Sequence, residues 1–91
     1  MKGRSLIVDD DTSMCDMLAV GLKKRGYEPV CVTTGNEALE RLSAQEFDVV
    51  VTDMNMRGIS GLELCQRAVE NRPDVPVIVI TAFGSMETAI A

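Results

Sequence analysis

Aromatic residues are scarce in this sequence, and histidine is absent. The aromatic residues are Tyr27, Phe47 and Phe83, so we expect a core built from Val, Ile, Leu, Met and Ala side chains. With 91 residues, the chain is expected to form one small domain that spans residues 1–91. A domain of this size buries a modest core, so the loss of any core element would matter for stability.

Basic clusters and long apolar runs are also missing. A net charge of −5 without clustered Lys and Arg argues against direct nucleic-acid binding, because phosphate contacts need such clusters. No apolar run approaches the length of a membrane span, and the early strand pattern leaves no room for a signal peptide. Cys15, Cys31 and Cys65 show no paired spacing, so we expect buried or half-buried free thiols. These features predict a cytoplasmic protein with reduced cysteines.

The sequence does contain a regular alternation of short apolar runs and amphipathic segments. Strands are expected at residues 6–8, 29–33, 48–52 and 77–80. Helices are expected at residues 12–25, 35–44 and 61–71, and a further helix is expected to begin at residue 85. Apolar strands that alternate with helices predict a parallel sheet covered on both faces, which is a doubly wound α/β fold. In such folds, functional residues lie at the carboxyl ends of the strands.

Carboxylates and a hydroxyl follow three of the predicted strands. Asp9, Asp10 and Asp11 follow the first strand, Asp53 follows the third, and Thr81 follows the fourth. If the first and third strands are neighbours, the carboxylates meet in one crevice and repel one another. A hard divalent cation relieves that repulsion, and oxygen ligands without nearby His or Cys favour Mg²⁺ or Mn²⁺. Because a carboxylate can also attack a phosphoryl group, the pattern fits phosphoryl transfer to an aspartate.

Some of these residues also have purely structural explanations. Asp11 suits the N-cap of the first helix, and Thr81 suits the end of a strand because it is β-branched. Asp53, which follows an apolar run, is harder to explain by structure alone. Acids at two strand ends together with a hydroxyl at a third are more specific than any one of these residues.

Three segments together resemble the receiver domain of bacterial two-component response regulators. The segments are residues 6–11, 49–56 and 77–82. The resemblance implies a flavodoxin-like receiver fold and a regulatory phosphoprotein rather than an enzyme. It also implies a phosphoryl donor, either a sensor histidine kinase or a phosphotransfer protein, and an output domain beyond Ala91. The stretch from Thr81 to Gly84 resembles regulators that act on transcription through an ATPase output domain.

The resemblance assigns roles to individual residues of the acidic motifs. It makes Asp53 the phosphoacceptor and a ligand of Mg²⁺. It makes Asp10 a direct metal ligand and Asp9 a ligand acting through water. The backbone carbonyl of Asn55 matches the position that gives the metal a third protein oxygen.

Further positions match the family's switch, and others depart from the family. Thr81 matches the hydroxyl that moves toward the phosphoryl group, and Ala82 matches the small residue that leaves room for phosphate. Arg57 stands where the family usually has proline, so we expect altered loop flexibility. The family's fifth strand, its fifth helix and its conserved lysine are absent from this chain. We therefore expect the phosphorylated chain to transmit little of the signal.

The fourth strand, at residues 77–80, is expected to become an exposed apolar edge. Such an edge promotes association, so we expect a homodimer, a dimer with exchanged elements, or marginal stability.

Two other functions fit parts of the pattern. A phosphatase of the haloacid dehalogenase type also places Asp-x-Asp after a first strand, but it gives Asp53 no role. A receiver that is never phosphorylated and serves for dimerisation or anchoring is favoured by the missing lysine. In every case the sequence offers no histidine and no glycine-rich phosphate loop, so the phosphoryl donor is another molecule.

Overall fold

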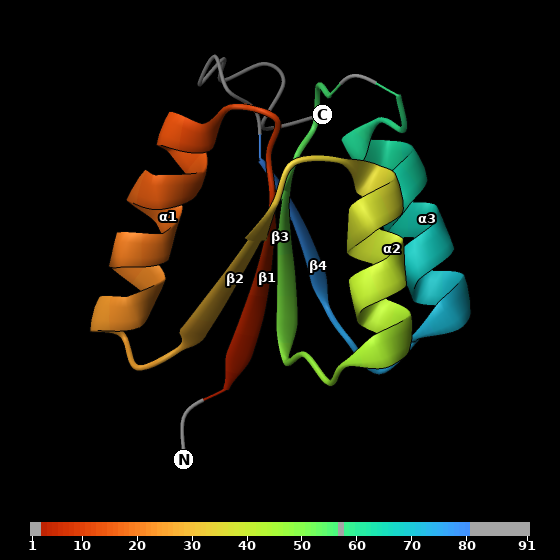
Figure 1. The fold of residues 1–91 in the computed structure, drawn as a ribbon. Helices are drawn as coiled ribbons and strands as arrows, with labels where there is room; N and C mark the ends of the chain where they lie inside the picture. Colours follow the sequence, from red (N-terminus) through yellow and green to blue (C-terminus); the bar gives the residue numbers. More distant parts are fainter. Residues whose placement is uncertain (1–2, 57, 81–91) are drawn as a thin grey trace.

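The computed structural model describes residues 3–56 and 58–80 of the chain, in which strands and helices alternate (Figure 1). The strands are β1 (Arg4–Val8), β2 (Glu28–Val32), β3 (Val49–Asp53) and β4 (Val77–Ile80). The helices are α1 (Thr12–Lys24), α2 (Gly35–Ala44) and α3 (Gly61–Asn71). The predicted bounds of α2, α3 and β4 are confirmed, whereas those of β2 and β3 were off by one residue. The first strand begins two residues earlier than predicted, and the first helix ends one residue earlier.

The four strands form one parallel sheet in the order β2-β1-β3-β4. The chain runs outward from β1 to β2 and then returns past β1 to β3, so the direction of winding reverses between β1 and β3. Helix α1 covers one face of the sheet, while α2 and α3 cover the other (Figure 1). This arrangement confirms the predicted doubly wound fold, and it places the switch point between the strands that carry the acidic residues.

The main core lies between the sheet and the pair α2 and α3. Its strand residues include Leu6, Val8 and Val50, which are fully buried. Leu42 of α2 and Leu64 of α3 meet them from the helices. The core is aliphatic as predicted, and Phe47 is the aromatic residue that it contains.

Helix α1 has a capping residue before its first turn and a glycine after its last turn. The Asp11 side chain accepts hydrogen bonds from the backbone N–H groups of Ser13 and Met14, which confirms it as the N-cap. At the other end, Gly26 takes a positive φ of 95°, and its N–H donates to the carbonyl of Lys23. Met17, an apolar residue of this helix, is 61% exposed and so does not belong to the core.

Strand β4 forms one edge of the sheet within the described part of the chain. It pairs with β3, and Ile78 on it is about half exposed. The predicted association through this edge stays a prediction. The helix expected from residue 85 lies outside the described residues. Among residues 3–56 and 58–80, no helix is both long and apolar enough to cross a membrane.

Candidate functional site: an acidic cluster at the carboxyl end of the sheet

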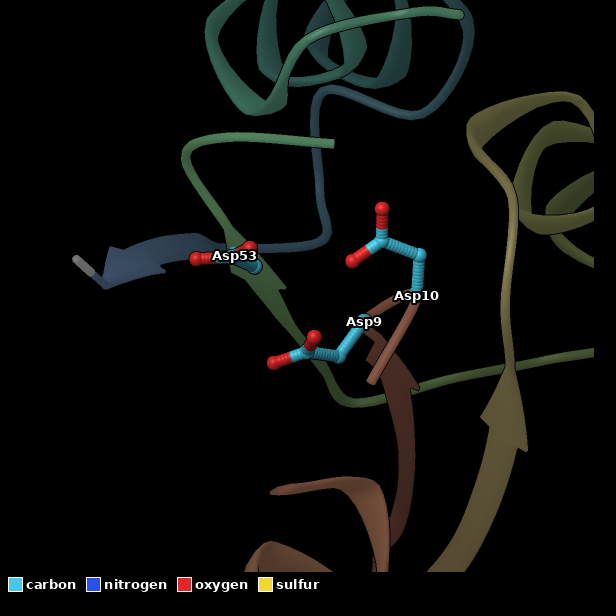
Figure 2. Close-up of side chains that lie close together, drawn as sticks. All are labelled: Asp9, Asp10 and Asp53. Atoms are coloured by element: carbon cyan, nitrogen blue, oxygen red, sulfur yellow. The ribbon is translucent and has the colours of Figure 1, made fainter. Parts of the chain in front are cut away.

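The sheet register brings the acids of β1 and β3 to the same level. Val8 pairs with Thr52, so Asp9 and Asp53 come next on adjacent parallel strands. Figure 2 shows the side chains of Asp9 and Asp10 at the end of β1 beside that of Asp53 at the end of β3. One carboxylate oxygen from each of the three residues lies within 4.8 Å of the others. The structure thus brings together the three acids that the sequence singled out as metal ligands.

Two of the three carboxyl groups are buried. Asp9 is 3% exposed and Asp53 is 4% exposed, while Asp10 is half-buried. Burial raises the pKa of the Asp53 carboxyl above its usual value, and the charge of Asp9 raises it further. Burial is also the main reason that the pKa of Asp9 is raised. Both shifts mean that the ionised cluster is destabilised by the protein around it.

Backbone N–H groups oppose this effect only in part. The N–H of Asp11 donates to Oδ1 of Asp9 over 2.9 Å and lowers the pKa of Asp9. The N–H groups of Asn55 and Met54 act in the same direction on the pKa of Asp53. Even so, Oδ1 of Asp53 is buried without a hydrogen-bond partner in the described part of the chain. A buried acceptor of this kind costs free energy unless a ligand satisfies it.

A tight loop after β3 holds Asp53 in place. The N–H of Met54 donates to the carbonyl of Ile80 on β4 over 2.8 Å. The N–H of Gly61, at the start of α3, donates to the carbonyl of Met54 over 2.9 Å. A Cβ atom at Gly61 would overlap the carbonyl oxygen of Asp53. Residue 61 must therefore be glycine for α3 to begin this close to Asp53.

The other sequence candidates have different positions. Asn55 is exposed and lies two residues after Asp53, so its carbonyl belongs to the loop at the site. Asp11 is the helix cap and is not one of the three clustered acids. Thr81 and Ala82, the predicted phosphoryl-binding residues, lie outside the described residues, as does Arg57.

Sequence reasoning gave no role to two residues that contact the site. Gly61 is one of them, and its only sequence signal was its place at the start of a predicted helix. Cys15 is the other, because its thiol donates to the backbone carbonyl of Asp9 over 3.8 Å. Its position inside a helix pattern gave no sign of that contact.

Comparison with known proteins agrees with this geometry. The family model for the response regulator receiver domain matches residues 5–91. The chain belongs to this family. The receiver predicted from the three sequence motifs is therefore confirmed, and the family favours the receiver over the phosphatase.

Individual relatives include regulators of transcription. The chain is 36% identical over 85 residues to the transcriptional regulatory protein ZraR of Escherichia coli. The match covers 93% of this chain and 19% of ZraR. The chain thus spans about a fifth of the length of the curated relatives that it matches.

Solved receiver structures share the fold across most of their length. The response regulator TrrA of Thermotoga maritima, crystallised with Mg²⁺ and BeF, is 36% identical and has a TM-score of 0.86. The alignment covers 92% of this chain and 72% of TrrA. A CheY-like receiver domain protein of Methanospirillum hungatei is 31% identical, with a TM-score of 0.87 over 99% of this chain and 72% of that one.

Proposed function

We propose that Asp53 is the phosphoacceptor of this receiver domain and that the acidic cluster holds Mg²⁺ for the transfer. One observation carries the proposal: Oδ1 of Asp53 is buried, lacks a hydrogen-bond partner among the described residues, and belongs to a carboxyl group next to those of Asp9 and Asp10. A carboxylate can act as a nucleophile toward a phosphoryl group, and this oxygen has no hydrogen bond in the described residues that would compete with a ligand.

The residues of the cluster suit a hard divalent cation. All the clustered ligand atoms are carboxylate oxygens, which Mg²⁺ prefers. Burial and mutual repulsion raise the pKa of Asp9 and of Asp53, and a bound cation would oppose both shifts because it stabilises the ionised carboxylates. We assign Asp10, Asp53 and the carbonyl of Asn55 as direct ligands and Asp9 as a ligand through water. The complex of TrrA with Mg²⁺ and BeF supports a magnesium site in this receiver, and the division of roles among the residues rests on the family resemblance.

The chemistry assigned to Asp53 is a single displacement at phosphorus. A carboxylate oxygen of Asp53 forms a bond to phosphorus while the bond from phosphorus to the donor breaks, and the leaving group keeps that electron pair. Bound Mg²⁺ supplies neutralisation of the phosphoryl oxygens. We expect the hydroxyl of Thr81 to donate to a phosphoryl oxygen, next to the space left by Ala82.

The donor and the target follow from the family. We propose that the phosphoryl group comes from a phosphohistidine on a sensor kinase or a phosphotransfer protein. We further propose that the receiver controls an output domain that acts on transcription, since ZraR is a transcriptional regulatory protein.

Acetyl phosphate provides the test, because it replaces the kinase as donor. The purified chain is incubated with acetyl phosphate and Mg²⁺, and its intact mass is measured. We expect a gain of one phosphoryl group that disappears when EDTA removes the Mg²⁺. Asp53→Asn should abolish the gain, and Asp48→Asn should leave it unchanged. Asp48 is the matched control because it is exposed at the other end of β3.

Three results would count against the proposal. A full phosphoryl gain in Asp53→Asn would place the acceptor elsewhere. Sustained release of phosphate from a generic phosphate ester, without a stable phosphorylated chain, would instead indicate a phosphatase. Binding of Mg²⁺ without any transfer would favour the receiver that is never phosphorylated.

A further inference from the structure

Two cysteines that are far apart in the sequence meet on one side of the sheet. Cys15 lies in the first part of α1, and Cys31 lies on β2, 16 residues further along the chain. Sγ of Cys31 is 3.6 Å from the backbone carbonyl oxygen of Cys15, to which it donates. The Cys15 thiol in turn points at the backbone, with the carbonyl oxygens of Asp9 at 3.8 Å and Val32 at 3.9 Å.

The two thiols lie close together between α1 and β2, because Sγ of Cys31 approaches the carbonyl of Cys15 and Sγ of Cys15 approaches the carbonyl of Val32, the residue after Cys31. Burial raises the pKa of the Cys15 thiol to about 12, and the second cause is a hydrogen bond with the Cys31 side chain. Helix α1 packs against strand β2, so the closeness of the two cysteines is part of the folded structure. The absence of paired spacing in the sequence therefore gave no warning that the two side chains are neighbours.

The two cysteines differ sharply in access to solvent. Cys15 is 3% exposed, whereas Cys31 is exposed because β2 is an edge strand of the sheet. The prediction that Cys31 is buried or half-buried filler was wrong. Cys65, which is partly exposed, lies on α3 at the opposite face of the sheet and serves as an internal control (Figure 1). An accessible thiol beside a sheltered one is the arrangement of a reacting and a resolving cysteine.

We propose that Cys15 and Cys31 form a reversible intramolecular disulfide when the chain meets a low-molecular-weight disulfide such as oxidised glutathione. The Cys31 thiolate attacks one sulfur of the glutathione disulfide and releases one glutathione. Cys15 then gives up its proton and attacks the Cys31 sulfur of the mixed disulfide, which releases the second glutathione. In total, two cysteine thiols are oxidised to one disulfide, and one glutathione disulfide is reduced to two thiols.

The disulfide would form next to the acidic cluster, near the start of α1. It would tie the first part of α1 to the edge strand, three residues after the start of that helix at Thr12. It would also remove the thiol hydrogen from the contact between Cys15 and the carbonyl of Asp9. The proposal does not depend on phosphorylation of Asp53, so each can fail without the other.

The test is a redox titration of the full chain. Reduced protein is equilibrated in buffers with increasing ratios of oxidised to reduced glutathione, exchange is stopped with acid, and free thiols, including the buried Cys15, are then alkylated in the unfolded protein in denaturant. Intact mass and peptide mapping identify the state of each cysteine. We expect Cys15 and Cys31 to lose alkylation together at one ratio, with a loss of two hydrogen atoms and no bound glutathione. The alkylation of Cys65 should change independently of that of Cys15 and Cys31.

Variants distinguish the disulfide from simpler oxidation. Cys31→Ser keeps the fold because its side chain is exposed, and it should leave Cys15 alkylatable at every ratio. Cys65→Ser should leave the paired loss unchanged. The proposal is overturned if Cys31 ends as a stable glutathione adduct while Cys15 remains a thiol. It is also overturned if Cys31 links two copies of the chain.

Discussion

The two ends of the sheet treat acidic side chains in opposite ways. At the amino end, Arg4 lies 3.1 Å from Glu28, and its backbone N–H donates to Asp48 over 2.7 Å. Beyond this end, Arg72 bridges Glu46 and Asp74, and it lowers the pKa of the Asp74 carboxyl. These acids are exposed and have cationic or N–H partners.

At the carboxyl end of the sheet, acidic side chains lie close to one another and not to basic partners. Asp9 and Asp53 are buried together, and within the described residues no Lys or Arg forms an ion pair with either of them. The pKa of each is raised rather than lowered. The difference is that the acids at the amino end are exposed and have favourable partners, whereas the buried acids at the carboxyl end reduce stability until a ligand binds. A local loss of folding stability, here from burying two carboxylates together, is typical of a functional site.

Substitution of Gly61 should have the largest effect on the carboxyl end. In Gly61→Ala, the new Cβ overlaps the carbonyl oxygen of Asp53, so the loop after β3 must move. We expect a loss of about 2 kcal/mol or more in the free energy of unfolding. We also expect impaired phosphorylation by acetyl phosphate. Urea unfolding and intact mass measure the two effects.

Gly21→Ala is the matched control for that substitution. Gly21 lies in α1, and a Cβ atom there meets no atom within 4 Å. Alanine should stabilise the helix by about 0.5–1 kcal/mol and leave phosphorylation unchanged. Equal destabilisation by the two substitutions would show that the tight loop at Asp53 is not special.

The pH dependence of stability should have opposite signs at the two ends. The folded pKa of Asp53 is raised, so its favourable contribution is present below 3.8 and is lost as the pH rises through the folded pKa. Without metal, wild-type protein should therefore lose stability relative to Asp53→Asn as the pH rises from 3.8 through the folded pKa of Asp53. Asp74 has a lowered pKa, so its contribution is present above 3.8 and is lost as the pH falls through the folded pKa.

Thermal unfolding of wild type, Asp53→Asn and Asp74→Asn across acidic to neutral pH, in EDTA, measures both signs. If the difference in melting temperature between wild type and Asp53→Asn were the same at all pH values, the raised pKa assigned to Asp53 would be contradicted.

The smallest effect is expected at Arg72. Its guanidinium donates to the carbonyl of Leu42 over 3.1 Å. This hydrogen bond satisfies a backbone carbonyl near the end of α2. Arg72→Ala should lower the melting temperature by a few degrees and leave phosphorylation unchanged. Glu46→Ala should have almost no effect, because Glu46 is 90% exposed and exposed ion pairs contribute little. A loss of phosphorylation in Arg72→Ala would show that the two ends are coupled.

The sequence predicted most of the fold because its signals are local. Helix α3, for example, is bounded by Ser60 as N-cap, and its bounds were predicted correctly. The errors at β2 and β3 are one-residue shifts, which come from sheet pairing with distant strands. The exposure of Met17 could not be predicted, because helical spacing alone does not show which apolar residues of a helix face the sheet.

The candidate site was predictable in part for the same reason. Asp9 and Asp10 come just after the apolar run of the first strand, and Asp53 comes just after that of the third, so their place at the carboxyl edge could be inferred from parallel pairing. The roles of Gly61 and Cys15 could not be inferred, because they depend on atomic contacts across the fold. The pairing of Cys15 with Cys31 likewise depends on how α1 packs against β2, which spacing along the chain does not encode.

Binding of Mg²⁺ tests the central claim most directly, because the claim is that the acidic cluster is a metal site for phosphoryl transfer to Asp53. Thermal unfolding is followed in metal-free protein while Mg²⁺ is titrated at neutral pH and constant ionic strength. We predict a saturable stabilisation of wild type and of Asp48→Asn, about 2.7 kcal/mol when free Mg²⁺ is about 100-fold above its Kd. Asp53→Asn should lose most of it. No stabilisation of wild type, or equal stabilisation of Asp53→Asn, would contradict the account.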